Sequence, residues 1–248
     1  MPQVRVHSDS DAAAAAVAHD IADLLITGQK AGRNVVLGLA TGSTPLPLYR
    51  ELVRLHREES LSFRNAVTFN LDEYEGLNGD HPQSYRRYMQ VNLFELVDIP
   101  RSSTHVPDAV AADPDAACRA FEAAIVAAGG IDLQVLGIGR TGHIGFNEPP
   151  SGRHTRTRRV VLDEITRRDN AAFFGSVDSV PRAAVTMGVD TILGARRVAL
   201  LAFGTAKAEV VRRAFTEKPN ADCPATWLQE HSACTYHLDP ASASLLKT

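Results

Sequence analysis

The chain has 248 residues, 44% of them hydrophobic, and its 26 basic and 29 acidic side chains give a formal net charge of -3. This length and hydrophobic content suffice for a full core in one large domain. Because charges of both signs are mixed throughout, nothing favours a nucleic acid or an anionic membrane as the main partner, and we expect a small molecule. No apolar stretch approaches the roughly 20 residues of a membrane helix.

Cysteine usage and the N-terminal residues bear on location. Cys118, Cys223 and Cys234 are odd in number and form no C-x-x-C pair. The first residues lack the charged and apolar segments of a secretory signal. The expected location of the protein is therefore cytoplasmic, in a reducing compartment. Because no repeat, low-complexity tract or linker interrupts the sequence, we predict a single domain over residues 1–248.

The first predicted elements are a helix, a strand and a second helix. Asp9 or Ser10 caps a helix of regularly spaced apolar residues that ends before Gly28. The apolar run NVVLGLA at 34–40 is typical of a strand buried on both faces. In the loop TGSTP at 41–45, the Thr-Pro pair is a credible N-cap and first residue of the next helix.

The order of strand, loop and helix repeats along the rest of the chain. The later predicted elements are a strand and loop at AVTFNLDEY (66–74), a helix from about Ser84, a helix over Pro114–Ala128 capped by Asp113, the strand IDLQVLGIG (131–139), the strand RRVALLAFG (196–204), the helix TAKAEVVRRAF (205–215) and a last strand ACTYHL (233–238) that finishes the sheet. This alternation predicts an α/β fold of three layers, a mainly parallel sheet with helices on both faces. Ligands gather at the carboxyl ends of the strands in such folds, where ATGSTP, NLDEY, GIGRTGH and AFGTAK fall.

Two helix starts have residues that suit an anion. Thr41, Gly42, Ser43 and Thr44 offer backbone N–H groups and three hydroxyls, although the loop lacks the ending of a Walker A motif and a tight turn explains it equally well. Lys207 lies in the first turn of its helix, where the helix dipole disfavours a cation unless an anion is bound. The alternative is a lysine that points into solvent. The two features together favour a phosphate site.

Two neighbouring carboxylates, Asp72 and Glu73, follow the strand that begins at Ala66. Side chains alternate along a strand, so these two point to opposite sides and only one can face the site. Alternation aligns Asp72 with Asn70, on the face opposite Leu71. Asp72 is therefore the candidate base, and Glu73 is predicted to be a structural partner.

The segment GIGRTGHIGFNEP at 137–149 places a histidine and a glutamate in a glycine-rich loop. Histidine is the one side chain that titrates near neutral pH without help, and Glu148 is placed to fold back and fix the orientation or charge of His143. A lone histidine is usually structural, but its position at the functional edge of the sheet favours catalysis. HIGFNE is not the zinc motif H-E-x-x-H, and no G-x-S-x-G motif supports a serine hydrolase. Acid–base chemistry on a phosphorylated small molecule, without a metal, is the remaining interpretation.

Seven segments, taken in order, carry a family resemblance: LATGSTP, VTFNLDEYEGL, HPQSY, GIGRTGHIGFNEP, TMGVDTIL, GTAK and ATWLQEH. They resemble the glucosamine-6-phosphate deaminases, also called glucosamine-6-phosphate isomerases, over nearly the whole chain. The sister family of 6-phosphogluconolactonases differs after the Gly-His pair. The resemblance implies the modified Rossmann-like fold of the deaminase type.

The resemblance also implies an activity and a set of site residues. Glucosamine 6-phosphate would be converted to fructose 6-phosphate and ammonia, in amino-sugar catabolism, without a metal or organic cofactor. His143 would open the sugar ring, Asp72 would move the C2 proton to C1, and Glu148 would tune His143. The phosphate would bind Thr41, Gly42, Ser43, Thr44 and Lys207, and Gly137 and Gly139 would lie close to the sugar.

Two positions depart from the family pattern. Many members have Asp or Asn where this chain has Thr141, and a hydroxyl cannot stabilise an imidazolium as a carboxylate does. The segment expected to form a mobile lid, about 151–182, usually supplies an arginine to the phosphate, but here Ala172 stands at that position. Arg167 or Arg168 is the candidate replacement.

The segment SGRHTRTRR at 151–159 carries four arginines and is either a second anion site or a solvated loop, of which we favour the loop. Some bacterial members are hexamers with a basic allosteric site, which Ser151 and Arg158 would match. Val160 and Val161 replace polar positions, so little or no allostery is expected. A homo-oligomer remains possible.

Two alternative functions stay open. A 6-phosphogluconolactonase-like hydrolase is disfavoured by the segment GFNEP. A non-catalytic sugar-phosphate sensor is disfavoured because the chain has no helix-turn-helix extension and no basic face. Release of ammonia from hexosamine phosphates separates the deaminase from both.

Overall fold

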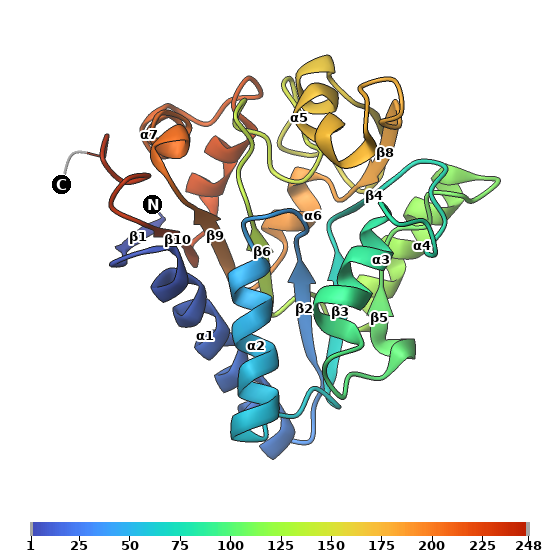
Figure 1. Cartoon of the computed structure of the whole chain (residues 1–248), viewed down its shortest axis with the longest axis vertical. Coiled ribbons are helices and arrows are strands. Elements are labelled where there is room, and N and C mark those ends of the chain that lie inside the picture. The colour runs from blue at the N-terminus through green and yellow to red at the C-terminus, as the bar shows by residue number, and fades with distance from the viewer. Residues whose placement is uncertain (1, 247–248) are drawn as a thin grey trace.

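A computed structural model describes residues 2–246 and contains one wholly parallel seven-stranded sheet (Figure 1). Along the sheet the order is β1-β10-β9-β6-β2-β3-β5. The strands are β1 (Gln3–Val6), β2 (Val35–Leu39), β3 (Ala66–Asn70), β5 (Thr104–His105), β6 (Leu133–Leu136), β9 (Val198–Ala202) and β10 (Cys234–Leu238). The predicted parallel α/β sheet is thereby confirmed.

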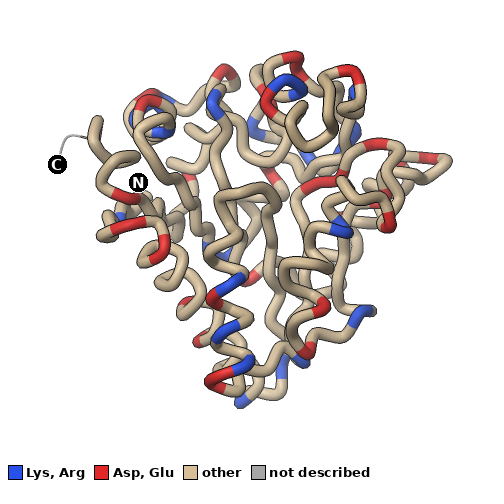
Figure 2. The backbone as a smooth tube through the Cα atoms, in the orientation of Figure 1, with Lys and Arg blue, Asp and Glu red and all other residues tan. Residues whose placement is uncertain are grey.

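Helices cover both faces of this sheet, which gives the predicted three layers. One face packs against α1 (Ser10–Lys30), α2 (Leu46–Glu59), α3 (Tyr85–Met89) and the π-helical turn Gln90–Phe94, and the other against α4 (Pro114–Ala127), α6 (Val189–Leu193), α7 (Ala208–Thr216) and the 3₁₀ helix Pro224–Glu230. In Figure 1, α1 and α2 lie in front of the strands. In the view of Figure 2, residues of both charge signs are interspersed, as the balanced composition predicts.

A second, antiparallel sheet lies beyond the carboxyl ends of the main strands, and the sequence did not predict it. Its order is β4 (Asp72–Tyr74), β8 (Ala183–Thr186) and β7 (Arg158–Val161). The chain leaves the main sheet at Leu71 and enters β4 at once. The helix α5 (Glu164–Phe174) lies beside this sheet at the top of Figure 1. Strands of three or four residues are too short to show a periodic pattern, which is why sequence analysis missed them.

The first helix begins where the sequence predicts but ends later. Asp9 is its N-cap, and the carboxylate of Asp9 accepts a hydrogen bond from the backbone N–H of Ala12 at 2.8 Å. The helix includes Gly28, so the prediction that this glycine lies beyond the end was wrong. A Cβ atom at position 28 would stand 2.5 Å from Cγ2 of Val35. Glycine therefore serves close packing of α1 on β2 rather than termination of the helix.

Three other predicted boundaries can be compared with the structure. Asp113 caps α4, and Ser84 caps α3. The predicted N-cap of α2 was wrong by one residue, because Pro45 holds that position and the first helical residue is Leu46. The last predicted strand exists as β10, but β1 pairs outside it and forms the sheet edge. Since β1 is largely exposed, no buried apolar run announces it.

The arginines at 153–159 are not a freely solvated loop, which corrects the interpretation from sequence. Arg153 and Arg156 both pair with Asp190. Arg159 lies in β7 and pairs with Glu75 of the neighbouring loop. The pairs with Asp190 fix the loop before β7 to α6, and the pair with Glu75 joins β7 to the residue that follows β4, so these three arginines serve the fold.

No helix within residues 2–246 is both long and apolar enough to cross a membrane. The predicted single domain covers 1–248, of which residues 1, 247 and 248 lie outside the described part. The single domain over 1–248 and the mobile lid at about 151–182 both remain predictions.

Candidate active site

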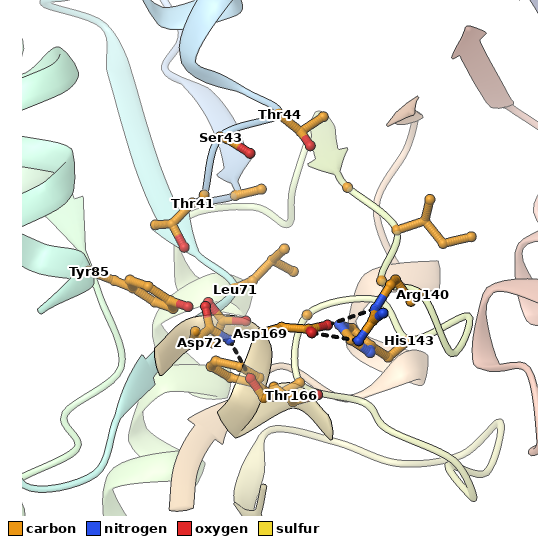
Figure 3. A pocket seen from close by; sticks show the side chains of 18 of the residues that line it. Thr41, Ser43, Thr44, Leu71, Asp72, Tyr85, Arg140, His143, Thr166 and Asp169 are labelled. Atoms are coloured by element: carbon orange, nitrogen blue, oxygen red, sulfur yellow. Dashed lines mark hydrogen bonds and ion pairs between the residues drawn. The ribbon is translucent and has the colours of Figure 1, made fainter. Parts of the chain in front are cut away.

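A cavity of about 310 Å³ lies at the carboxyl ends of the main strands (Figure 3). Loops that follow β2, β3, β6 and β9 line it, as expected for a parallel sheet. The predicted site residues that it brings together are Thr41, Gly42, Ser43, Thr44, Asp72, Gly137, Gly139, His143 and Lys207. Glu148 does not line it. Residues far apart in the sequence thus meet in one space, since Thr41 and Lys207 both border it.

One end of the cavity has the groups that an anion needs. The loop from Thr41 to Thr44 precedes α2, and its Gly42 carbonyl accepts a hydrogen bond from the hydroxyl of Tyr88 at 2.6 Å. Lys207 turns into the cavity, where its Nζ donates to the carbonyl of Ile138 at 2.7 Å. The alternative of a lysine pointing into solvent is therefore wrong. Burial lowers the pKa of Lys207, and a bound anion would offset the cost of that burial.

Asp72 is a buried carboxylate in the wall of the same cavity, with 6% of its surface exposed. Within residues 2–246 its carboxylate accepts no hydrogen bond. Burial, and next the charge of Glu73, raise the pKa of Asp72 to about 8. A Cβ atom at Gly145 would lie 3.4 Å from Oδ2 of Asp72, so the loop that carries His143 passes directly over this carboxylate. With a pKa of about 8, most of the carboxyl is protonated at pH 7, and the ionised fraction is a stronger base than an exposed carboxylate toward a group held in the cavity.

Glu73 points away from the cavity, as strand alternation predicts. Its carboxylate accepts hydrogen bonds from the backbone N–H groups of Tyr74 and Tyr85 at 2.9 Å and of Arg86 at 3.0 Å. Two of these donors belong to the first turn of α3, where N–H groups have no partner within the helix. Glu73 thus ties α3 to β4 and holds the strand that carries Asp72.

Replacing Glu73 with alanine is expected to lower the free energy of unfolding by about 1–3 kcal/mol, because buried N–H groups lose their acceptor. In a chain of this size that corresponds to a fall in Tm of about 2–12 °C. Glu75→Ala is the matched control, since it removes the exposed ion pair with Arg159. Thermal unfolding followed by circular dichroism measures both. An unchanged Tm in Glu73→Ala would contradict this role.

His143 is held by a hydroxyl and by close backbone packing. Thr141 Oγ1 and His143 Nδ1 form a hydrogen bond of 3.0 Å. A Cβ atom at Gly139 would overlap the imidazole ring, so only glycine admits the ring there. Gly142 has φ +86°, a conformation that favours glycine. Burial, and next the charge of Lys207, lower the pKa of His143 to about 4. The imidazole is therefore neutral near pH 7.

Glu148 lies apart from His143. Its Oε2 accepts a hydrogen bond from the backbone N–H of Asp163 at 2.6 Å, and no hydrogen bond among the described residues joins it to the imidazole. The predicted direct orientation of His143 by Glu148 is thus not seen, because Thr141 holds Nδ1 instead. Any effect of Glu148 on His143 stays a prediction.

A second cavity of about 390 Å³ contains Glu148 together with Ser151, Arg158, Val160 and Val161. The guanidinium of Arg158 donates to the Ser151 hydroxyl at 3.3 Å, which brings together the two residues that the resemblance assigned to an allosteric site of some bacterial members. The expectation of little or no allostery stays a prediction.

Sequence analysis missed two charged residues of the main cavity, Arg140 and Asp169. The Arg140 guanidinium donates to both carboxylate oxygens of Asp169, from Nε at 2.9 Å and from Nη2 at 2.5 Å (Figure 3). The candidate replacements for the lid arginine were wrong: Arg167 donates to the carbonyl of Val177, and Arg168 pairs within α5. Arg140 stands inside the GIGRTGH motif, which was the available signal. Among residues 2–246, no three His, Cys, Asp or Glu side chains gather as a metal site.

Comparison with known proteins places this site in a family. The model of the glucosamine-6-phosphate isomerases/6-phosphogluconolactonase family matches residues 8–237. The glucosamine-6-phosphate deaminase of Shewanella loihica is 51% identical over 232 residues, which are 94% of this chain and 87% of the relative. The glucosamine-6-phosphate deaminase 1 of Bacillus subtilis is 48% identical over 212 residues, which are 86% of this chain and 88% of the relative.

Solved structures agree with the sequence relatives. A monomeric glucosamine-6-phosphate deaminase is similar with a TM-score of 0.94 and 44% identity, and 98% of this chain and 99% of that chain are covered. The 6-phosphogluconolactonase of Leishmania guyanensis is similar with a TM-score of 0.78 and 22% identity, with 100% of both chains covered. At that identity the second likeness shows the fold alone. The chain therefore belongs to the family of glucosamine-6-phosphate isomerases and 6-phosphogluconolactonases.

Proposed function

We propose that this chain is a glucosamine-6-phosphate deaminase, which converts glucosamine 6-phosphate and water to fructose 6-phosphate and ammonia. The main observation in support is that one cavity is lined by the Asp72 carboxylate, the His143 imidazole and the anion-binding groups of Lys207 and the 41–44 loop. The names of the relatives at about half identity support the same substrate. The proposal requires no cofactor.

His143 carries out the first step, the opening of the sugar ring. Its neutral imidazole accepts the proton of the anomeric hydroxyl and delivers a proton to the ring oxygen as the bond between C1 and that oxygen breaks. The low pKa of His143 keeps the acceptor form populated near pH 7. Thr141 fixes the ring through Nδ1, which leaves Nε2 for the proton transfer.

Asp72 carries out the second step, the transfer of hydrogen from C2 to C1. Its carboxylate removes the C2 proton, the electrons of that bond form a C1–C2 double bond, and the C1 carbonyl oxygen takes a proton from the C2 ammonium group, which gives an enolamine. The proton held by Asp72 then returns at C1 as the nitrogen lone pair forms the double bond to C2. The product is an imine at C2, to which water adds before ammonia leaves. A base held against one C–H bond gains both from proximity and from general base catalysis. Its raised pKa makes Asp72 a stronger base than an exposed carboxylate.

The assay that tests this proposal is ammonia release from a panel of hexosamine 6-phosphates, with 6-phosphogluconolactone hydrolysis measured beside it. We expect ammonia from glucosamine 6-phosphate and no lactone hydrolysis above background. Lactone hydrolysis without ammonia would favour the lactonase alternative, and thermal-shift binding without turnover would favour the sensor. A sugar phosphate is thus the proposed partner, while a cytoplasmic location and a homo-oligomer remain predictions.

The activity is expected to depend on the ionisation of Asp72. A base must be deprotonated to act, and the pKa of Asp72 is raised to about 8 by burial. The ratio kcat/KM, which reports the free enzyme, should therefore rise with pH up to about 8 and then level off. His143 has a pKa of about 4 and stays neutral over this range. A profile that is flat below pH 7, after correction for ionisation of the substrate, would contradict the assignment.

A further inference from the structure

Three charged side chains of the cavity, Arg140, Lys207 and Asp169, take no part in the proton transfers proposed above. Of the described residues that line it, Arg140 and Lys207 are the basic ones. Asp169, from α5, reaches the same cavity and binds Arg140 through both carboxylate oxygens. In the view of Figure 3 Asp169 lies between Asp72 and Arg140, and Arg140 lies next to His143. The guanidinium of Arg140 is therefore already bound by a carboxylate of the protein inside the substrate cavity.

The three charges act on one another. The Asp169 carboxylate raises the pKa of Lys207, and the Arg140 guanidinium lowers it, although burial has the largest effect. Asp169 also raises the pKa of His143. Asp169 thus acts on both Lys207 and His143, and it is the negative charge that already neutralises Arg140.

The ion pair is easy to exchange. The side chain of Arg140 is 58% exposed and that of Asp169 is 42% exposed, and pairs of this kind contribute about 0.2–1 kcal/mol. A phosphate monoester carries about 1.5–2 negative charges at pH 7 and offers three acceptor oxygens. The planar guanidinium of arginine binds such a group through two parallel hydrogen bonds. A substrate phosphate can therefore displace the single carboxylate.

We propose that Arg140 binds the phosphate group of the substrate, and that Asp169 occupies the guanidinium as a counter-ion until the phosphate displaces it. Arg140 thereby supplies a positive charge from the loop before His143. Displacement of Asp169 also releases the contact between α5 and this loop. The identity of the substrate rests on the proposed function, whereas binding of the anion does not.

The test measures binding of inorganic phosphate by calorimetry to the full chain and three variants. Arg140→Gln is expected to weaken binding about 10- to 100-fold, the loss typical of a charge-assisted hydrogen bond. Asp169→Asn is expected to tighten it about 1.5- to 5-fold, because the competing ion pair is removed. Arg168→Gln is the matched control, since it breaks an exposed ion pair of α5 that lies outside the cavity. It should leave phosphate binding unchanged.

A double variant strengthens the test. The gain from Asp169→Asn should vanish when Arg140 is already glutamine, because the two residues act through one contact. For glucosamine 6-phosphate, Arg140→Gln should raise KM by about the same factor as it weakens the binding of inorganic phosphate. The change in kcat should be much smaller. Arg140→Lys, which keeps the charge but not the planar fork, should recover part of the loss.

Two results would overturn the inference. If Arg140→Gln and Asp169→Asn weaken phosphate binding alike, the pair is only a structural link between α5 and the loop. If Arg140→Gln leaves both phosphate binding and KM within about twofold of wild type, Arg140 does not touch the phosphate. Failure of the proposed function looks different: phosphate binding would still depend on Arg140, but no hexosamine phosphate would release ammonia.

Discussion

Replacing Asp72 with asparagine is expected to lower kcat about 10²- to 10⁴-fold, the usual contribution of a positioned general base. Asparagine keeps the size and shape of the side chain but cannot accept the C2 proton. The cavity and the groups for phosphate are unchanged, so KM should change little. Steady-state ammonia release measures both constants. A variant with kcat within tenfold of wild type would remove Asp72 from the mechanism.

The same variant should be more stable than the wild type, which separates loss of chemistry from loss of fold. The pKa of Asp72 rises from 3.8 to about 8 on folding, so the folded state binds a proton that the unfolded state releases between these values. The free energy of unfolding of the wild type therefore falls as pH rises through this range. That of Asp72→Asn does not, because the amide does not titrate. The Tm advantage of Asp72→Asn should be larger at pH 8 than at about pH 5. A lower Tm at both values would contradict this account of the burial.

Replacing His143 with glutamine is expected to lower kcat about 10²- to 10⁴-fold as well, because no group then moves the proton between the anomeric hydroxyl and the ring oxygen. Glutamine can form hydrogen bonds but cannot take up and release a proton. Ammonia release under saturating substrate measures the effect. Turnover within tenfold of wild type would show that the ring opens without His143.

Thr141→Val provides a graded comparison for this variant. It removes the hydrogen bond to Nδ1 and keeps the imidazole, so the ring loses its fixed orientation but not its chemistry. The expected fall in kcat is about fivefold, in line with the net contribution of one hydrogen bond. A fall as large as that of His143→Gln would mean that ring orientation, and not proton transfer, dominates the effect.

The main sheet could be predicted because its central strands are buried on both faces. A strand such as Val35–Leu39 then reads as a continuous apolar run that no turn or exposed helix imitates. The second sheet shows the limit of this signal. Its strands have three or four residues, and β7 begins with two arginines, of which Arg159 pairs with Glu75, far away in the sequence. Only the folded chain shows that such a segment pairs as a strand.

Some residues of the candidate site could likewise be predicted from the sequence, and others could not. Asp72, His143 and Lys207 were predicted because each lies in the segment that follows a strand of the main sheet, and carboxyl ends of parallel strands meet at one edge. Arg140 and Asp169 were missed because their contact joins residues 29 positions apart and depends on how α5 lies against the loop. The direct link between Glu148 and His143 was expected from sequence proximity, but the backbone turns Glu148 toward Asp163.

The most direct test of the central claim is a crystal structure with the open-chain alditol analogue of glucosamine 6-phosphate. The account predicts the phosphate on the backbone N–H groups of residues 42–44 and on Lys207, and C2 within about 3.5 Å of the Asp72 carboxylate, the reach of a reacting pair. His143 should lie beside the C1 and O5 end of the same molecule. A phosphate bound elsewhere, or a C2 atom out of reach of Asp72, would contradict it.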